Sequence, residues 1–186
     1  MVTRIDQNQF VVMMRFGCLA CMLAFVLPAH AQLPDTLSAG TRVEVEGKGA
    51  GAGSIRAEEV EIQSQRGGKD TLKGSVRTVD PASQTLTVAG VKIVASDATL
   101  LEGPDREPVP FSEFQPGQRL KAEGVFGQDG HFTAERLSVR KEKAEKADEV
   151  AFEGPVQQVD PGSKTFTVFG VTVMVTPQTA FQRERN

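Results

Sequence analysis

The sequence lacks several residue types on which common sites depend. It contains no tryptophan and no tyrosine, and both of its cysteines, Cys18 and Cys21, lie near the amino terminus. Beyond residue 31 the chain has no cysteine and a single histidine, His131. These absences exclude a disulfide framework there and leave few partners for a histidine-based metal site or a catalytic triad. Stability must therefore come from packing.

The chain also has little excess charge of either sign, because its formal net charge is only −3. A mildly acidic surface does not attract phosphate backbones over long range. Grooves that bind single-stranded nucleic acid combine positive charge with stacking aromatic rings, and neither is concentrated here. Nucleic acid is therefore not an expected partner.

The one long apolar run, Phe16 to Leu27, lies between Arg15 and Pro28-Ala29-His30-Ala31. A basic residue, a short apolar core and small residues at the cleavage positions are typical of a secretory signal. We expect residues 1–31 to be a signal peptide and the protein to be periplasmic or secreted. The run is shorter than the roughly twenty residues that span a bilayer, so no stable membrane insertion is expected after cleavage.

The remaining sequence is organised around a stretch that occurs twice. Residues 74–94 match residues 154–174 at an offset of 80, with 11 of 21 positions identical. A second match, at an offset of 77, relates residues 40–47 to residues 117–124. Self-similarity at a fixed spacing indicates repeated structural units.

Within each copy apolar residues alternate with polar ones, which predicts β-strands with one buried face. Ala89-Gly90 and Phe169-Gly170 have the composition of two-residue hairpin tips. The glycine-rich segment 47–53 resembles a phosphate-binding loop, but it precedes a strand pattern instead of a helix and is better interpreted as another hairpin tip.

From Gly74 onward the order is three strands, a helical turn at residues 110–114 and two strands, which is the order of an OB-type five-stranded barrel. We therefore expect an all-β fold with two tandem OB-like five-stranded barrels. Two contiguous barrels, at 32–105 and 106–186, are favoured because neither needs strands from distant parts of the chain to close it. The alternative is one contiguous barrel at 73–140 with the outer pieces pairing into a second.

These residues resemble a known family. The pattern runs Gly74-x-Val-x-x-Val-Asp, Thr85-x-Thr-Val-x-Gly-Val, Phe111-x-x-Phe-x-Pro-Gly-Gln-x-Leu-x-x-Glu-Gly and Gly130-x-Phe-x-Ala-Glu-x-Leu-x-Val. It is similar to the secreted bacterial repeats catalogued as domain of unknown function 5666. The resemblance implies a small β-barrel and an envelope location, and it provides no catalytic residue.

Three carboxylate or imidazole side chains, Asp129, His131 and Glu135, could form a weak divalent-cation site, or His131 could be an exposed turn residue. Two aspartates, Asp80 and Asp160, could act as acids, but each precedes a proline and is better interpreted as a turn cap.

The aromatic residues are unevenly distributed, because every phenylalanine beyond residue 31 lies at or after Phe111. Phe169 shares a strand face with Thr165 and Thr167 and ends at a hairpin tip, where we expect it to be exposed. With Phe126 it could form a partner-binding patch, the alternative being a contact between the two barrels.

Taken together, the sequence favours a non-enzymatic, exported binding module that needs no cofactor and has an envelope protein or polysaccharide as partner. The alternative is a periplasmic stress protein that binds a small ligand or a divalent cation at the hairpin around Asp129.

Overall fold

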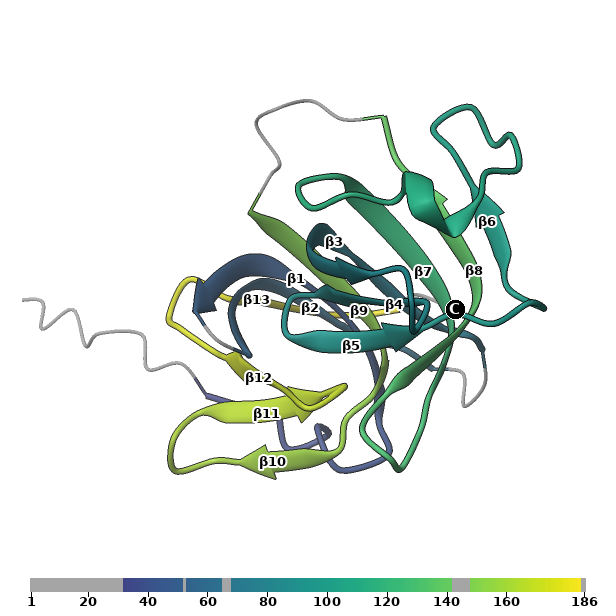
Figure 1. Ribbon diagram of the computed structural model, residues 1–186. Helices are drawn as coiled ribbons and strands as arrows, with labels where there is room; N and C mark the ends of the chain where they lie inside the picture. Colours follow the sequence, from purple (N-terminus) through teal and green to yellow (C-terminus); the bar gives the residue numbers. More distant parts are fainter. Residues whose placement is uncertain (1–31, 52, 65–67, 142–147, 185–186) are drawn as a thin grey trace, which may run out of the picture.

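A computed structural model describes residues 32–51, 53–64, 68–141 and 148–184. The signal peptide expected at residues 1–31 lies outside these ranges. The described residues form an all-β structure, which confirms the expected class (Figure 1). Among them no helix is long and apolar enough to cross a membrane.

The inner unit, residues 70–139, contains a closed barrel of five strands. Its antiparallel ladders join β3 to β4, β4 to β5, β3 to β7 and β7 to β8, and a parallel ladder between β5 and β8 closes the ring. A sixth strand, β6, extends the sheet beside β8, and η1 is a single 3-10 turn. The elements are β3 (Asp70–Asp80), β4 (Thr85–Val88), β5 (Val91–Val94), β6 (Leu100–Glu102), η1 (Phe111–Glu113), β7 (Arg119–Phe126) and β8 (Phe132–Val139).

The outer unit is assembled from both ends of the described chain. Its strands pair in the order β10, β11, β12, β2, β1, β9, and β13 lies beside β2. Figure 1 shows the blue β1 and β2 next to the yellow β12 and β13. The elements are β1 (Arg42–Gly51), β2 (Ser54–Ile62), β9 (Glu149–Pro155), β10 (Gln158–Asp160), β11 (Thr165–Val168), β12 (Val171–Met174) and β13 (Ala180–Arg183).

The pairing does not follow the favoured division at residue 105. Strands β3 and β5 pair with β7 and β8, respectively, on the other side of that boundary, and β1 and β2 pair with β9 and β12. The strands instead form a contiguous inner unit, and the outer pieces of the chain pair with each other. The connection from β5 to β7 explains the choice, because its β6 pairs with β8 and its Phe111 and Phe114 are buried. These contacts hold β7 and β8 against the preceding strands.

The two units join through β3 and β9. Leu72 is paired with Phe152, and these two residues occupy equivalent positions at the offset of 80. A pairing of equivalent positions creates an approximate two-fold axis between the units. Each unit therefore presents the same hairpins to the other, once on each side of the axis.

The core follows the alternation expected from the sequence. Val43 and Val45 of β1 are fully buried, whereas Glu46 is exposed. At Gly124 a β-bulge brings the chain so close to Thr133 that an added Cβ would lie 2.0 Å from its carbonyl oxygen. Gly47 has the same role in β1, where the distance to the Arg56 carbonyl oxygen is 2.2 Å. Glycine is thus required where each hairpin bends.

Candidate functional site

Two equivalent hairpin tips lie at the junction of the units. Ala89 and Gly90 have φ values of 51° and 88°, and Phe169 and Gly170 have φ values of 55° and 72°. Two consecutive left-handed residues between antiparallel strands form a type I′ turn, so both expected tips are confirmed. The two tips have the same backbone conformation, but the first residue of the tip is alanine in one copy and phenylalanine in the other.

Phe169 is buried, with 3% of its surface exposed. Its ring centroid lies 5.3 Å from that of Phe126, 5.6 Å from Phe132 and 5.9 Å from Phe152. The ring also covers Gly154, where an added Cβ would lie 2.4 Å from its Cζ atom. The expectation that Phe169 is exposed is therefore wrong, because the two-fold arrangement places its hairpin on the neighbouring unit.

The other residues expected in that patch do not form an exposed aromatic surface either. Phe126 is half-buried and packs against Phe169. Thr165 and Thr167 are half-buried on β11, where Thr165 Oγ1 lies 2.8 Å from Ser163 Oγ. The structure thus supports the alternative, in which the phenylalanines form the contact between units. We call this the filled side of the junction.

The opposite side of the junction is hollow. Ala89 occupies the position equivalent to Phe169, and Gly49 the position equivalent to Phe126. Both line an open cavity of about 760 Å³, whose floor is Ile55, Val76 and Val150. Cavities of several hundred cubic ångströms are of the size that binds ligands. We call this cavity the inter-unit hollow.

Polar groups surround the hollow. Ser54 and Thr87 contribute hydroxyls, and the exposed side chains of Arg77 and Asp148 lie at its rim. Glycines 51, 53, 90 and 117 also line it, so parts of its wall are bare backbone. The hollow therefore combines an apolar floor with hydrogen-bonding walls.

A buried ion pair lies at the filled side. Arg42 Nη1 lies 3.1 Å from Asp70 Oδ1, and both residues are buried. Asp70 Oδ2 also accepts a hydrogen bond from the Phe126 N–H at 2.9 Å. At the equivalent positions Arg119 donates to the Glu149 carbonyl oxygen, and Val150 replaces Asp70. Salt bridges in the protein interior need such additional hydrogen bonds to offset desolvation.

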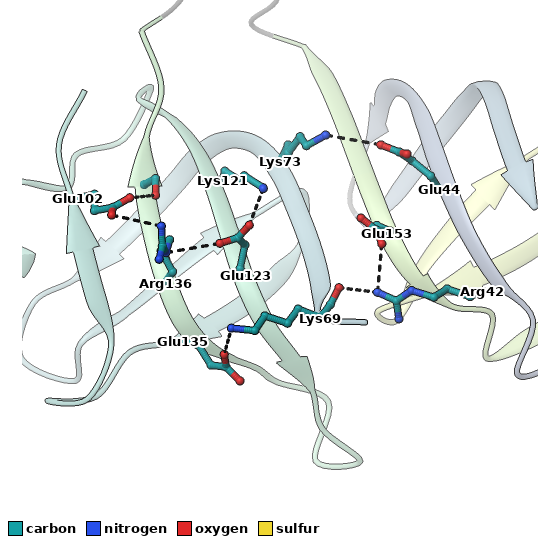
Figure 2. Close-up of polar contacts among 11 residues, drawn as sticks. Arg42, Glu44, Lys69, Lys73, Glu102, Lys121, Glu123, Glu135, Arg136 and Glu153 are labelled. Atoms are coloured by element: carbon teal, nitrogen blue, oxygen red, sulfur yellow. Dashed lines mark hydrogen bonds and ion pairs between the residues drawn. The ribbon is translucent and has the colours of Figure 1, made fainter. Parts of the chain in front are cut away.

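Charged side chains on one face of the sheet that spans both units pair with one another (Figure 2). Arg136 contacts Glu123 at 3.6 Å and Glu102 at 3.4 Å, and Lys121 donates to Glu123 at 2.5 Å. This hydrogen bond from Lys121 lowers the pKa of Glu123 below its ordinary value. Farther along the sheet Lys73 lies 3.6 Å from Glu44. Paired charges of this kind support the scaffold and offer no concentrated binding site.

The structure does not gather the three residues of the possible cation site around one point. Asp129 accepts a hydrogen bond from the His131 N–H at 3.2 Å within the hairpin turn, whereas Glu135 is paired with Lys69 at 2.6 Å. No group of three or more potential metal-ligating side chains occurs among the residues that the structure describes. The three residues act in the turn and in an ion pair instead.

The two proline-adjacent aspartates cap turns, as expected. Asp80 Oδ1 accepts the Ala82 N–H at 3.0 Å, and Asp160 Oδ1 accepts the Gly162 N–H at 2.9 Å. Hydrogen bonds from Ser83 and Ser163, respectively, are the main cause that lowers the pKa of each aspartate.

Sequence reasoning identified the difference between Ala89 and Phe169 but placed the candidate patch at Phe169, which the structure buries. The missed residues are the small ones, Ala89 and Gly49, because a cavity is produced by what they leave unfilled. The signal was available as a large-to-small difference between aligned copies. This difference could be interpreted only once it was known that Ala89 and Phe169 both face the other unit.

Comparison with curated proteins found no match, and comparison with solved structures found none either. A family model matches residues 27–61, 73–138 and 153–186. The middle segment covers most of the inner unit, and the outer two contain most of the strands of the outer unit. With most of its length matched, the chain belongs to the family described as domain of unknown function (DUF5666).

Proposed function

We propose that the protein is a non-enzymatic, exported binding module built from two OB-like barrels that share one junction. Support for the two barrels comes from the ladders. The outer unit repeats the inner unit's pairings, for example Val173 with Ile55 where the inner unit pairs Ile93 with Phe132. The proposal of an OB-like fold is supported by the ring of the inner unit, in which β3 pairs with β4 and β7, and β8 pairs with β5 and β7.

The observation that carries the binding role is the inter-unit hollow. One side of a nearly symmetric junction is filled by phenylalanines, whereas the other is left open over about 760 Å³. Filling that space with side chains from the same chain is sterically feasible, as the filled side demonstrates. An open cavity at a junction of two rigid units is a common position for a binding site.

The lining favours recognition over catalysis. Most of its side chains are small or aliphatic, and its charged members, Arg77 and Asp148, lie exposed at the rim. The signal-like residues 1–31 support an exported location, which makes an envelope protein or a polysaccharide the expected partner. The alternative cation-binding role has less support, since Glu135 lies 2.6 Å from Lys69.

Capture from an envelope extract tests the proposal. The chain lacking residues 1–31 is immobilised beside the Ala89→Phe variant, which fills the hollow, and the Ala82→Phe variant, which adds the same ring at an exposed turn. We expect the unmodified chain and Ala82→Phe to retain a common component that Ala89→Phe loses. Equal retention by all three proteins would contradict a role for the hollow.

A further inference from the structure

The structure also indicates the chemistry of the partner. We propose that the inter-unit hollow binds an aromatic side chain presented by an extended peptide segment of a partner protein. This inference rests on the binding function proposed above and narrows its partner from the wider class of envelope molecules.

The filled side serves as a template for the occupant. Phe169 and Phe126 pack there with ring centroids 5.3 Å apart, whereas the hollow has Ala89 and Gly49 at the equivalent positions. The tip backbones are alike, with φ of 51° at Ala89 and 55° at Phe169. At these two positions the side chains that the hollow lacks are therefore aromatic ones.

The floor of the hollow favours an apolar occupant. Val150 stands where the filled side has Asp70, which is committed there to Arg42 and to the Phe126 N–H. Val150 and Ile55 line the hollow with aliphatic atoms instead. Removing an aromatic ring from water against such a floor is favourable, and no buried charge needs a partner at that position.

The walls and rim suit a peptide. The hollow continues the packed interface between the units, and the hydroxyls of Ser54 and Thr87 can hydrogen-bond to a peptide backbone beside the ring. Arg77 and Asp148 place opposite charges at the rim, where they can pair with residues that flank the aromatic anchor. Sugar rings often stack on an aromatic side chain, and the residues that line the hollow include none.

Selection from a random peptide library displayed on phage tests this inference with defined ligands. We expect the chain lacking residues 1–31 to enrich peptides that share one Phe, Tyr or Trp position. Replacing that residue by alanine in a synthetic peptide should weaken binding about tenfold or more by calorimetry. The variant with both Gly49→Phe and Ala89→Phe should lose binding, whereas Ala82→Phe should retain it.

The Gly49→Phe single variant guards against misfolding of the double variant. An added Cβ at Gly49 meets no atom within 4 Å, so this variant is expected to fold and to weaken peptide binding. Enrichment of peptides without an aromatic residue, equal binding by folded filled variants, or no enrichment would overturn the inference.

Failure of this inference can be separated from failure of the binding function. If the component captured in an Ala89-dependent manner resists protease and is destroyed by glycosidase, the partner is a polysaccharide. The binding role would then stand, whereas the aromatic peptide would be ruled out. If capture does not depend on Ala89 and no peptide binds, both proposals are overturned.

Discussion

At the scale of single residues, Phe169 combines an unfavourable backbone with a favourable environment. A bulky residue with a φ of 55° is uncommon because its Cβ crowds the backbone. Burial among Phe126, Phe132 and Phe152 offsets that cost. The ring is thus held in place by packing from the neighbouring unit.

We expect Phe169→Ala to lower the free energy of unfolding by about 3–5 kcal/mol, the range for removing a buried phenylalanine side chain. Urea denaturation followed by circular dichroism measures it. Thr167→Ala, on the same strand and half-buried, is the matched control and should cost far less. A loss at Phe169 no greater than at Thr167 would contradict a packing role for the ring.

Asp80 and Asp160 give stability a dependence on acid. Their pKa values are lowered from 3.8 in the folded protein, chiefly by the Ser83 and Ser163 hydrogen bonds. A depressed pKa contributes stability that is present above the unfolded value and is lost as the pH falls through the folded value. Unfolding midpoints should therefore fall as the pH drops below about 4.

The Asp80→Asn and Asp160→Asn double variant checks this prediction. Its midpoints in urea, measured from pH 7 to pH 2, should fall less steeply at low pH than those of the unmodified protein. Asp97→Asn is the control, because Asp97 is an exposed aspartate in another turn. Identical acid dependence in the double variant and the unmodified protein would show that the two caps contribute little.

At the scale of elements, one buried ion pair links β1 to β3, both of which pair with β9. Arg42 reaches from β1 to Asp70 on β3 and also donates to the Lys69 carbonyl oxygen at 2.5 Å. Glu153 on β9 lies 3.4 Å from the same guanidinium. The pair therefore ties the outer unit to the inner unit beside the phenylalanine cluster.

We expect Asp70→Val to cost about 3–5 kcal/mol, because it leaves Arg42 buried without its main counter-ion. Adding Arg42→Met should recover much of the loss, since replacing both members of a buried pair by apolar residues is often tolerated. Chemical denaturation of the single and double variants measures both effects. A single variant as stable as the unmodified protein would contradict the role assigned to the pair. Glu58→Gln, which removes the exposed Lys48–Glu58 pair, should have little effect.

At the scale of the whole molecule, the described chain forms one contiguous unit and one composite unit. The ladders that close the barrel of β3, β4, β5, β7 and β8 all lie within residues 70–139, and β3 also pairs with β9 of the outer unit. Strands β1 and β2 pair with each other, but their remaining partners, β9, β12 and β13, lie more than eighty residues later in the chain. Cutting the chain into fragments should therefore spare the inner unit but disrupt the outer one.

We expect a fragment of residues 68–141 to unfold cooperatively, at a lower temperature than the full chain because it loses the packing of Phe169. A fragment of residues 32–105 should not, since its strands lack β7, β8, β9 and β12. Calorimetry on both fragments measures the difference. A cooperative transition in residues 32–105 alone would instead support the contiguous division considered first.

Much of the fold could be predicted from the sequence because its signals are local. The alternation around Val43 and Val45, the caps at Asp80 and Asp160 and the hairpin tips at residues 89–90 and 169–170 depend on neighbouring residues alone. The pairing of the strands could not be predicted in the same way. Because the two copies share one pattern, the β1–β2 hairpin and the β7–β8 hairpin are nearly equally suited to pair with β3.

The sequence by itself determined the all-β class, the turns and the family to which the chain belongs, because alternation, glycine and proline act over a few residues. Only the tertiary structure decided which strands pair and where the two copies meet. It buried Phe169, which the sequence placed at an exposed tip, and it turned the small residues Ala89 and Gly49 into the walls of a hollow. Whether a side chain becomes part of the core or lines a cavity depends on the residues that face it from the other unit. Contacts between segments distant in sequence determine which residues those are.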